Sequence, residues 1–359
     1  MNYIESKIGV AMAALLAVAE VRGDEAPVTL PELVVTATST DVGYQAHDAA
    51  VAKIDIPIFD LPVSIQIVPR EVLDDQQVIR LEDALKNVSG VYQAFNNGFG
   101  EPDYGLRGFR QFFVYEDGFR VPGVPGPGFQ EIAHLERVEV LKGPAAALYG
   151  RIEPGGLIHQ VTKRPLATAS YALRQQFGSF DLYRTTLDAT GPLTKDGTLR
   201  YRLNIANENA DSFRDFVDRE GLFVSPVVTW NIGAHTQASV DYQYRFRDNS
   251  SDRGIPIVNG RPAPVAISRY YEEPGISAVE TESHRGGFMW SHAFNDRWVL
   301  RHRFKAERDR LDGQRIEPGR VIDGRTLPRT ARDRTQDTET YFTTLDLTGE
   351  LRTGPFRHR

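Results

Sequence analysis

The 359-residue sequence contains no cysteine, and that absence excludes several kinds of site. Without thiols the chain forms no disulfide, holds no metal through thiolates and has no cysteine nucleophile. Beyond the N-terminus, no run of about 18 apolar residues is present, so no helix there is expected to cross a bilayer. The net charge is −6 and arginine is spread along the chain, so the sequence has no basic patch for nucleic acid.

Signatures of enzyme active sites are missing as well. The sequence has no HExxH motif, no GxSxG elbow and no Walker loop, and its eight histidines are scattered. Glu116 and Asp117 fall in an expected turn, and we interpret them as solvated or structural. The protein is therefore not expected to be an enzyme.

The hydrophobic content of 41% is sufficient for about two packed domains, and one stretch of the first is distinctive. In residues 137–165, two alternating apolar runs predict strands on either side of a loop rich in glycine and proline. The loop residues that permit tight turns or positive φ are Gly143, Pro144, Gly150, Pro154, Gly155 and Gly156. The loop carries Tyr149. On composition alone it also fits an ordinary glycine-rich connection in an α+β domain.

Residues 51–165 read as one compact α+β unit. An alternating strand is predicted at Val63–Val68, and a short amphipathic helix within Arg80–Val91. A further strand at Phe112–Gly118 ends in an Asp-Gly pair, which predicts a tight turn. The segment therefore has the size and pattern of a small mixed domain.

These blocks, in this order, resemble the plug domain of TonB-dependent outer-membrane receptors, in particular the ferric-siderophore receptor branch. The resemblance is carried above all by LKGPAAALYGRIEPGGLIHQVTKRP, and LPVSIQIVPREVLDDQ favours the siderophore branch. It implies a small α+β plug of about four strands inside a large barrel. It also implies that the loop with Tyr149 rises toward the ligand.

The N-terminal 50 residues carry two further resemblances. Residues 1–23 resemble a signal peptide, since Lys7 precedes an apolar stretch, and a short buried helix is the alternative. Residues 30–40 resemble a TonB box with its linker, a short strand that adds to the edge of a partner's sheet. The residues expected to contact TonB are Glu32, Leu33, Val34, Val35, Thr36 and Ala37. A first strand of the plug is the alternative for this segment.

Residues 166–359 consist of long segments that alternate at period two. Between Thr236 and Asn249, for example, Val240 and Tyr242 lie on one face while Asp241 and Gln243 lie on the other. This pattern is typical of transmembrane β-barrel strands, although alone it also fits a soluble β-sandwich with one wet face. About eight strands are predicted, near residues 170–178, 182–191, 198–210, 220–231, 235–248, 283–294, 297–310 and 338–352. Long polar loops are predicted at 249–281 and 312–336, on the extracellular side.

The predicted fold is thus an α+β plug followed by antiparallel transmembrane β-barrel strands, an incomplete barrel. Eight strands enclose a lumen that their own side chains fill, whereas the family implies a 22-stranded barrel around the plug. Residues 166–359 are therefore expected to form the N-terminal part of a barrel in a longer receptor. A non-functional remnant is the alternative.

The family implies a receptor in the outer membrane of a Gram-negative bacterium. Such a receptor would contact outer-membrane lipid, bind a ferric siderophore and import it with energy from TonB and its inner-membrane complex. Cobalamin, haem or a glycan are alternative cargoes. No metal site or cofactor is expected, because the iron is held within the siderophore by hard oxygen donors.

The resemblance also implies which plug residues contact the ligand. Arg107 and Tyr149 occupy the expected apex positions, because arginine pairs with chelator oxygens and aromatic rings stack on the chelator. The weaker candidates nearby are Phe109, Phe99, Arg151 and Phe129. For each residue the alternative is packing within the plug or an ion pair between plug and barrel.

Overall fold

The fold is described from a computed structural model of the chain. It describes residues 61–96, 102–111, 114–121, 131–143, 149–150, 152–349, 351–354 and 356–358, together with residues 44, 46, 49–52 and 58. The predicted signal peptide and the predicted TonB box lie outside the described residues.

The plug is built from two small sheets and two short helices. The five-stranded sheet has the order β1-β7-β8-β5-β6, with β1 Ser64–Pro69, β7 Leu135–Lys142, β8 Gly156–Thr162, β5 Val114–Glu116 and β6 Phe119–Val121. The three-stranded sheet contains β2 Val91–Asn96, β3 Pro102–Leu106 and β4 Phe109–Gln111. The helices are α2 Arg70–Asp75 and α3 Leu81–Leu85, and η1 Ala50–Ala52 is a 3₁₀ turn. The plug therefore has more strands than the four or so that the resemblance implied.

The local predictions for the plug are confirmed with one change of length. The predicted strand Val63–Val68 corresponds to β1, and the runs on either side of the glycine-rich loop form β7 and β8, which pair antiparallel. The Asp-Gly turn joins β5 to β6, and both its residues have positive φ, 48° at Asp117 and 85° at Gly118. α3 ends at Leu85 and is therefore shorter than the helix that the periodicity within Arg80–Val91 predicted. Within the described part of the chain, no helix combines the length and hydropathy needed to cross a bilayer.

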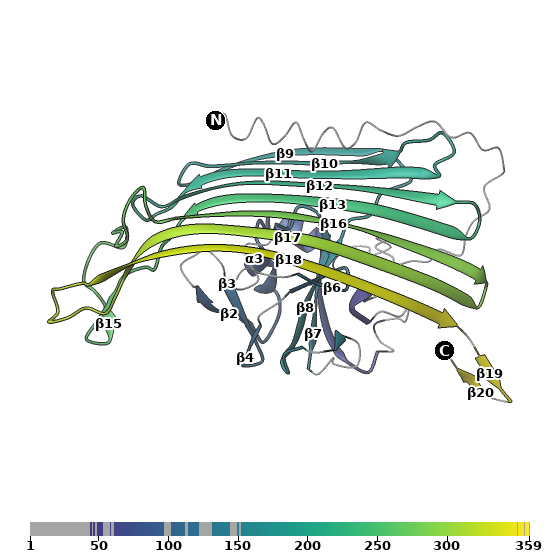
Figure 1. The fold of residues 1–359 in the computed structure, drawn as a ribbon, viewed down its shortest axis with the longest axis horizontal. Helices are drawn as coiled ribbons and strands as arrows, with labels where there is room; N and C mark the ends of the chain where they lie inside the picture. The colour runs from purple at the N-terminus through teal and green to yellow at the C-terminus, as the bar shows by residue number, and fades with distance from the viewer. Residues whose placement is uncertain are drawn as a thin grey trace.

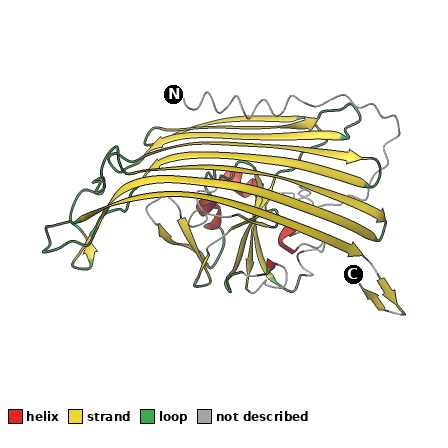
Figure 2. Ribbon diagram, viewed as in Figure 1, coloured by secondary structure: helices red, strands yellow, loops and turns green. Residues whose placement is uncertain are grey.

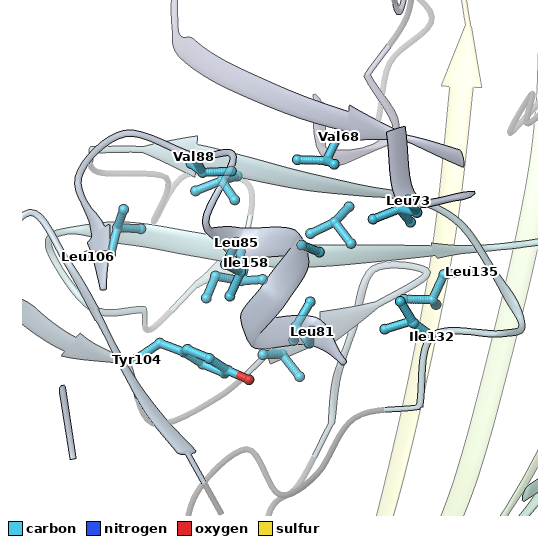
Figure 3. Close-up of a cluster of buried hydrophobic side chains, with 14 of the residues drawn as sticks. Val68, Leu73, Leu81, Leu85, Val88, Tyr104, Leu106, Ile132, Leu135 and Ile158 are labelled. Atoms are coloured by element: carbon cyan, nitrogen blue, oxygen red, sulfur yellow. The ribbon is translucent and has the colours of Figure 1, made fainter. Parts of the chain in front are cut away.

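A core of apolar side chains joins the plug elements around α3 (Figure 3). Leu81, Ala84 and Leu85 of α3 are buried against side chains of the larger sheet, such as Val138 and Ile158. Burying each large apolar side chain contributes about 1.5–3 kcal/mol relative to leaving it exposed. The apolar residues spaced at helical period within Arg80–Val91 are therefore the ones that pack α3 onto the five-stranded sheet.

An eight-stranded antiparallel sheet follows the plug in sequence, and the plug lies against its concave face (Figure 1). Its strands, in their spatial order, are β9 Ser170–Gly178, β10 Leu182–Pro192, β11 Leu199–Asp211, β12 Asp218–Ile232, β13 Thr236–Ser250, β16 Ala278–Asn295, β17 Trp298–Pro318 and β18 Arg329–Gly349. β9 and β18 are the edges of this open sheet. Short hairpins lie in a loop and near the C-terminus: β14 Ile257–Val258 with β15 Arg261–Pro262, and β19 Leu351–Thr353 with β20 Phe356–His358 (Figure 2). The eight predicted barrel strands are confirmed.

Polar and apolar residues alternate along the strands, so the two faces of the eight-stranded sheet differ in polarity. On β13 the side chain of Val240 is 61% exposed on the outer face, whereas Gln243 is buried and donates a hydrogen bond to Glu116 of the plug. On β16 Arg285 contacts the same plug residue, while Phe288 has the opposite parity and is partly exposed. The outer face is thus apolar and the inner face polar, as the period-two pattern predicted.

The strands extend further at one end than their apolar pattern indicated. The predicted loop 312–336 is wrong in length, since β17 continues to Pro318 and β18 begins at Arg329. The loop 249–281 is likewise shortened, because β16 begins at Ala278. In these extensions charged residues such as Asp312 and Asp337 occupy the outer face, so the alternation of apolar and polar residues stops before the strand does.

Gly156 provides a test of how the glycine-rich loop closes onto β8. Its φ of +131° disfavours other residues, and an added Cβ would collide with the Leu141 carbonyl oxygen. Gly150 also has positive φ, +70°, but nothing lies within 4 Å of an added Cβ. We expect Gly150→Ala to lower the free energy of unfolding by about 1–2 kcal/mol, the cost of the left-handed backbone alone. Gly156→Ala should cost clearly more in urea unfolding, and equal losses would contradict the steric argument.

Candidate functional site

The tip of the β3–β4 hairpin carries two of the predicted ligand residues. Leu106 pairs with Phe109, so the turn consists of Arg107 and Gly108, whose φ values are +54° and +85°. Two consecutive positive φ values are typical of a tight type I′ hairpin turn, for which glycine is favoured. The Arg107 N–H donates to the carbonyl oxygen of Gly90 at 2.9 Å, which holds the turn against the end of the α3 segment.

This tip lies against the base of the glycine-rich loop. The Gly143 N–H donates to the Gly155 carbonyl oxygen at 2.9 Å and closes the loop. A Cβ added to Gly143 would lie 3.3 Å from a guanidinium nitrogen of Arg107, and one added to Gly155 would contact Phe109. The structure therefore brings together the two motifs that carried the predicted ligand residues.

The members of the predicted ligand set differ in their surroundings. Arg107 is exposed, and Phe109 has 47% of its surface exposed although it is apolar. Both are therefore accessible to a ligand. Phe99, Phe129 and Arg151 lie outside the described residues.

Tyr149 is held by packing within the plug. Its ring meets that of Tyr115 edge-to-face, with ring centres 5.2 Å apart, and lies among the apolar side chains around Leu141 and Leu157. Burial raises the pKa of Tyr149 well above its ordinary value, so the phenol stays protonated. This environment matches the plug-packing alternative. Contact of Tyr149 with ligand stays a prediction.

The sequence did not reveal that Glu116 is buried between plug and sheet. Its carboxylate accepts hydrogen bonds from Arg285 of β16 and Gln243 of β13, both at 2.7 Å. The ring nitrogen Nε2 of His134 lies 3.0 Å from the other carboxylate oxygen. Burial alone raises the pKa of Glu116, but Arg285 and His134 hold it well below its usual range. Of the two interpretations of Glu116, solvated or structural, the structure supports the structural one.

Further ion pairs connect the plug with other strands of the sheet. Arg184 of β10 donates to Glu131 at 2.6 Å and to Glu208 of β11 at 3.1 Å. Lys163, just after β8, donates to Asp188 at 2.8 Å. Several plug segments that meet the sheet are thus held by oppositely charged partners.

A small polar cavity lies within this interface. Its lining includes Asp117, His134 and Lys163 from the plug and Asp241 and Lys305 from the sheet. Lys305 of β17 and Asp241 of β13 form an ion pair across Gly287 of β16, which lies opposite both residues in the register. Both signs of charge are present and the lining is almost entirely polar, so the cavity belongs to the plug–sheet interface. Among the residues described, no group of three or more histidines or acidic residues has a metal-binding arrangement.

Glu139 ties the N-terminal segment to the plug core. Its carboxylate accepts from Arg137 at 2.7 Å and from the N–H groups of Ala50 and Val51 at 2.9 and 2.7 Å. His159 Nδ1 lies 3.2 Å away. Burial acts against ionisation, but these donors lower the pKa of Glu139 to about 2. Residues 50–51, which follow the predicted TonB box, are therefore held by this ionised side chain, and Val51 is also buried in an apolar cluster of the plug.

Comparison with known proteins gives one consistent family. A model of the TonB-dependent receptor plug domain matches residues 57–157. The metal-pseudopaline receptor CntO of Pseudomonas aeruginosa is 36% identical over 348 residues, which cover 93% of this chain and 48% of CntO. The catecholate siderophore receptor Fiu of Escherichia coli K12 is 26% identical over 372 residues, which cover 95% of this chain and 48% of Fiu. The chain thus spans about half the length of these curated relatives.

A solved structure agrees in fold. The ferripyoverdine receptor of the outer membrane of Pseudomonas aeruginosa, bound to ferripyoverdine, matches 89% of this chain and 44% of that one. The TM-score is 0.81 at 22% sequence identity. This likeness confirms the predicted combination of a plug with antiparallel barrel strands.

Glu139 predicts an acid dependence of plug stability. Its pKa is about 2 in the fold and about 4.3 in an unfolded chain, so its stabilising effect is complete above pH of about 4.5 and is lost as the pH falls toward 2. The loss at low pH amounts to about 3 kcal/mol. We expect Glu139→Gln to be less stable at pH 7 and to lose less stability on acidification, measured by urea unfolding. Parallel pH profiles of the two proteins would contradict this role.

Proposed function

The chain belongs to the TonB-dependent receptor family and contains the plug domain and part of the barrel. We propose that it is part of a receptor that imports a ferric siderophore. The receptor would lie in the outer membrane of a Gram-negative bacterium, with the apolar outer face of the sheet against lipid. The observation that carries this proposal is the meeting of Arg107 and Phe109 with the glycine-rich loop. An exposed guanidinium beside an exposed aromatic ring suits a ligand with oxygen donors and a planar or apolar surface.

The protein's role in this proposal is recognition and transport, not catalysis. Iron enters as cargo already bound by its chelator, so the receptor needs no ligands of its own for the metal. CntO, at 36% identity, and Fiu, at 26% identity, both carry names of receptors for metal chelates, which supports this class of cargo.

A second candidate cargo is a metal complex of the pseudopaline kind. The support is the identity of 36% to a metal-pseudopaline receptor, compared with 26% to a catecholate receptor. The two cargoes are separated by measuring binding of each labelled complex to outer membranes that contain the full receptor. Binding of neither complex would contradict the proposal as a whole.

The proposal includes TonB as the partner that supplies energy. The contact would be made by Glu32, Leu33, Val34, Val35, Thr36 and Ala37, added as a strand to a sheet edge of TonB. Pulling on this segment would reach Tyr44, whose hydroxyl donates to Asp75, and then residues 50–51, which Glu139 holds. The energy would thereby reach the plug through its N-terminal connection.

Substitution of the TonB box tests this coupling. Val34→Pro removes a backbone donor from the added strand, so uptake should be lost while ligand binding at the cell surface is retained. Val34→Thr keeps the N–H and the β-branched shape and serves as the matched control. Uptake of labelled chelate is measured in cells whose other receptors are deleted. Normal uptake by Val34→Pro would show that the box is elsewhere.

Substitution of Arg107 tests the ligand site. Removing a charged hydrogen-bond donor costs about 1.5–3 kcal/mol, so Arg107→Ala should weaken binding of the cognate chelate roughly tenfold or more. Arg110→Ala is the control, since Arg110 is also exposed and lies on the same hairpin outside its turn. Affinity is measured by titration of the purified receptor. Equal effects of the two substitutions would remove Arg107 from the ligand site.

A further inference from the structure

The apolar part of the outer face ends along a diagonal line toward the long loops. The last large apolar side chains on this face are those of Tyr183 on β10, Phe246 on β13 and Tyr341 on β18. In the row of paired residues that contains Tyr183, β13 contributes Asp248 and β18 contributes Thr335. The line therefore descends across the rows, as a membrane surface does across strands tilted by about 35–45°.

Beyond this line the outer face is charged. Toward the loops, the next outward position after Phe246 is Asp248, and the one after Tyr341 is Glu339. Arg308 donates to Asp337 at 2.7 Å, and these two side chains are 60% and 47% exposed. Charged side chains are costly on the lipid face of a barrel. The line therefore marks the outer surface of the membrane for a receptor placed as proposed above.

The strands differ in how far they continue beyond this line (Figure 1). A strand tilted by about 45° crosses the hydrocarbon with about 9–11 residues. β9 has 9 residues and β10 has 11, and only Leu182 of β10 lies beyond Tyr183. β17 and β18 have 21 residues each, and β18 extends beyond Tyr341 as far as Arg329. The sheet therefore stands clear of the membrane at β17 and β18, whereas the β9–β10 turn lies at the membrane surface.

Aromatic side chains gather at this turn. On the outer face, Phe177 and Tyr183 lie directly opposite each other, and their rings meet edge-to-face with centres 5.6 Å apart. Phe180 in the turn is 54% exposed, and its ring centre lies 6.5 Å from that of Phe213 in the β11–β12 loop. The Asp211 N–H donates to the Phe180 carbonyl oxygen at 2.8 Å, so the turn and the start of the loop lie side by side. The aromatic surface of the strands thus continues onto both connections.

The loop that carries Phe213 is held in place from below. The neighbouring Arg214 is buried, and its guanidinium donates to Asp252 at 2.9 Å and to the carbonyl oxygen of Ile267. Phe213 is nevertheless 47% exposed. Exposed apolar surface of this kind is typical of a place where a protein meets a partner or a membrane.

We propose that Phe180 and Phe213 insert into the headgroup region of the outer leaflet and anchor the β9–β10 turn and the β11–β12 loop to the membrane. This inference rests on the proposed outer-membrane location and adds which extracellular connections touch lipid. Aromatic rings are favoured at this depth, where an apolar body and a polar boundary meet. Lipid is the occupant because the two rings continue the lipid-facing pair Phe177 and Tyr183. The β17–β18 loop, carried on longer strands, stays in water.

The test places a nitroxide label at single introduced cysteines in the full receptor, reconstituted into vesicles of phosphatidylethanolamine and phosphatidylglycerol. These 359 residues contain no cysteine, and any cysteine in the rest of the receptor is replaced by serine. Collisions of the label with oxygen, which concentrates in lipid, are compared with collisions with a water-soluble nickel chelate. The oxygen-to-nickel ratio for Phe180→Cys and Phe213→Cys should exceed that for Ile322→Cys at least about threefold, because apolar anchors lie about 5–10 Å deep. Ile322 is the matched control, since it is 51% exposed in the β17–β18 loop.

A label at Val240→Cys separates this inference from the proposed location, because Val240 is 61% exposed within the apolar outer face. If its ratio is as low as that of Ile322→Cys, the outer face does not meet lipid, and the proposed location fails together with the anchor. If Val240→Cys reports lipid while Phe180→Cys and Phe213→Cys match Ile322→Cys, only the anchor is wrong. If a bound ferric chelate shields the labels at Phe180→Cys and Phe213→Cys from the nickel chelate, the rings face the cargo, which also overturns the anchor.

Discussion

The structure depends on pairing the Glu116 carboxylate where the plug meets the sheet. A charge removed from water costs several kcal/mol unless opposite charges and hydrogen bonds replace the lost hydration. For Glu116 those partners come from the plug, through His134, and from two strands of the sheet, through Gln243 and Arg285. Neither the plug nor the sheet alone supplies all of these partners. The position of the plug is thereby fixed by electrostatics in addition to shape.

The same constraint explains the chemistry of the sheet. A wall with an apolar outer face must turn its polar residues inward, and inward-facing arginines require carboxylates within reach. The plug supplies them with Glu116 and Glu131, while Asp188 of the sheet pairs with Lys163 of the plug. The polar half of each alternating strand is therefore the surface that the plug recognises. The charged inner face of the sheet and the charged surface of the plug are held together by these ion pairs.

Local patterns predicted most of the fold, and the misses have physical causes. The eight strands follow from period two, and the β5–β6 turn follows from its Asp-Gly pair. The C-terminal part of β17 and the N-terminal part of β18 were missed because charged residues such as Asp312 and Asp337 lie on the outer face there and look like loop residues. The burial of Glu116 was not predicted because its partner Arg285 is 169 residues away in sequence. Arg107 and Tyr149 were identified from the sequence, but the approach of Arg107 to Gly143 and the packing of Tyr149 depend on pairing between distant strands.

The two kinds of contact in this protein differ in what separation costs. If plug and sheet part and water enters, the freed charges regain their hydration, which offsets most of the lost ion pairing. The apolar core around α3 has no such compensation, because exposing Leu81, Leu85 and Ile158 to water loses the free energy that their burial contributes. The boundary between plug and sheet is therefore easier to open than the plug interior, provided that water reaches both partners together. The small polar cavity lined by Asp117 and Lys305 lies on that boundary, so the polar groups of plug and sheet face a common space there.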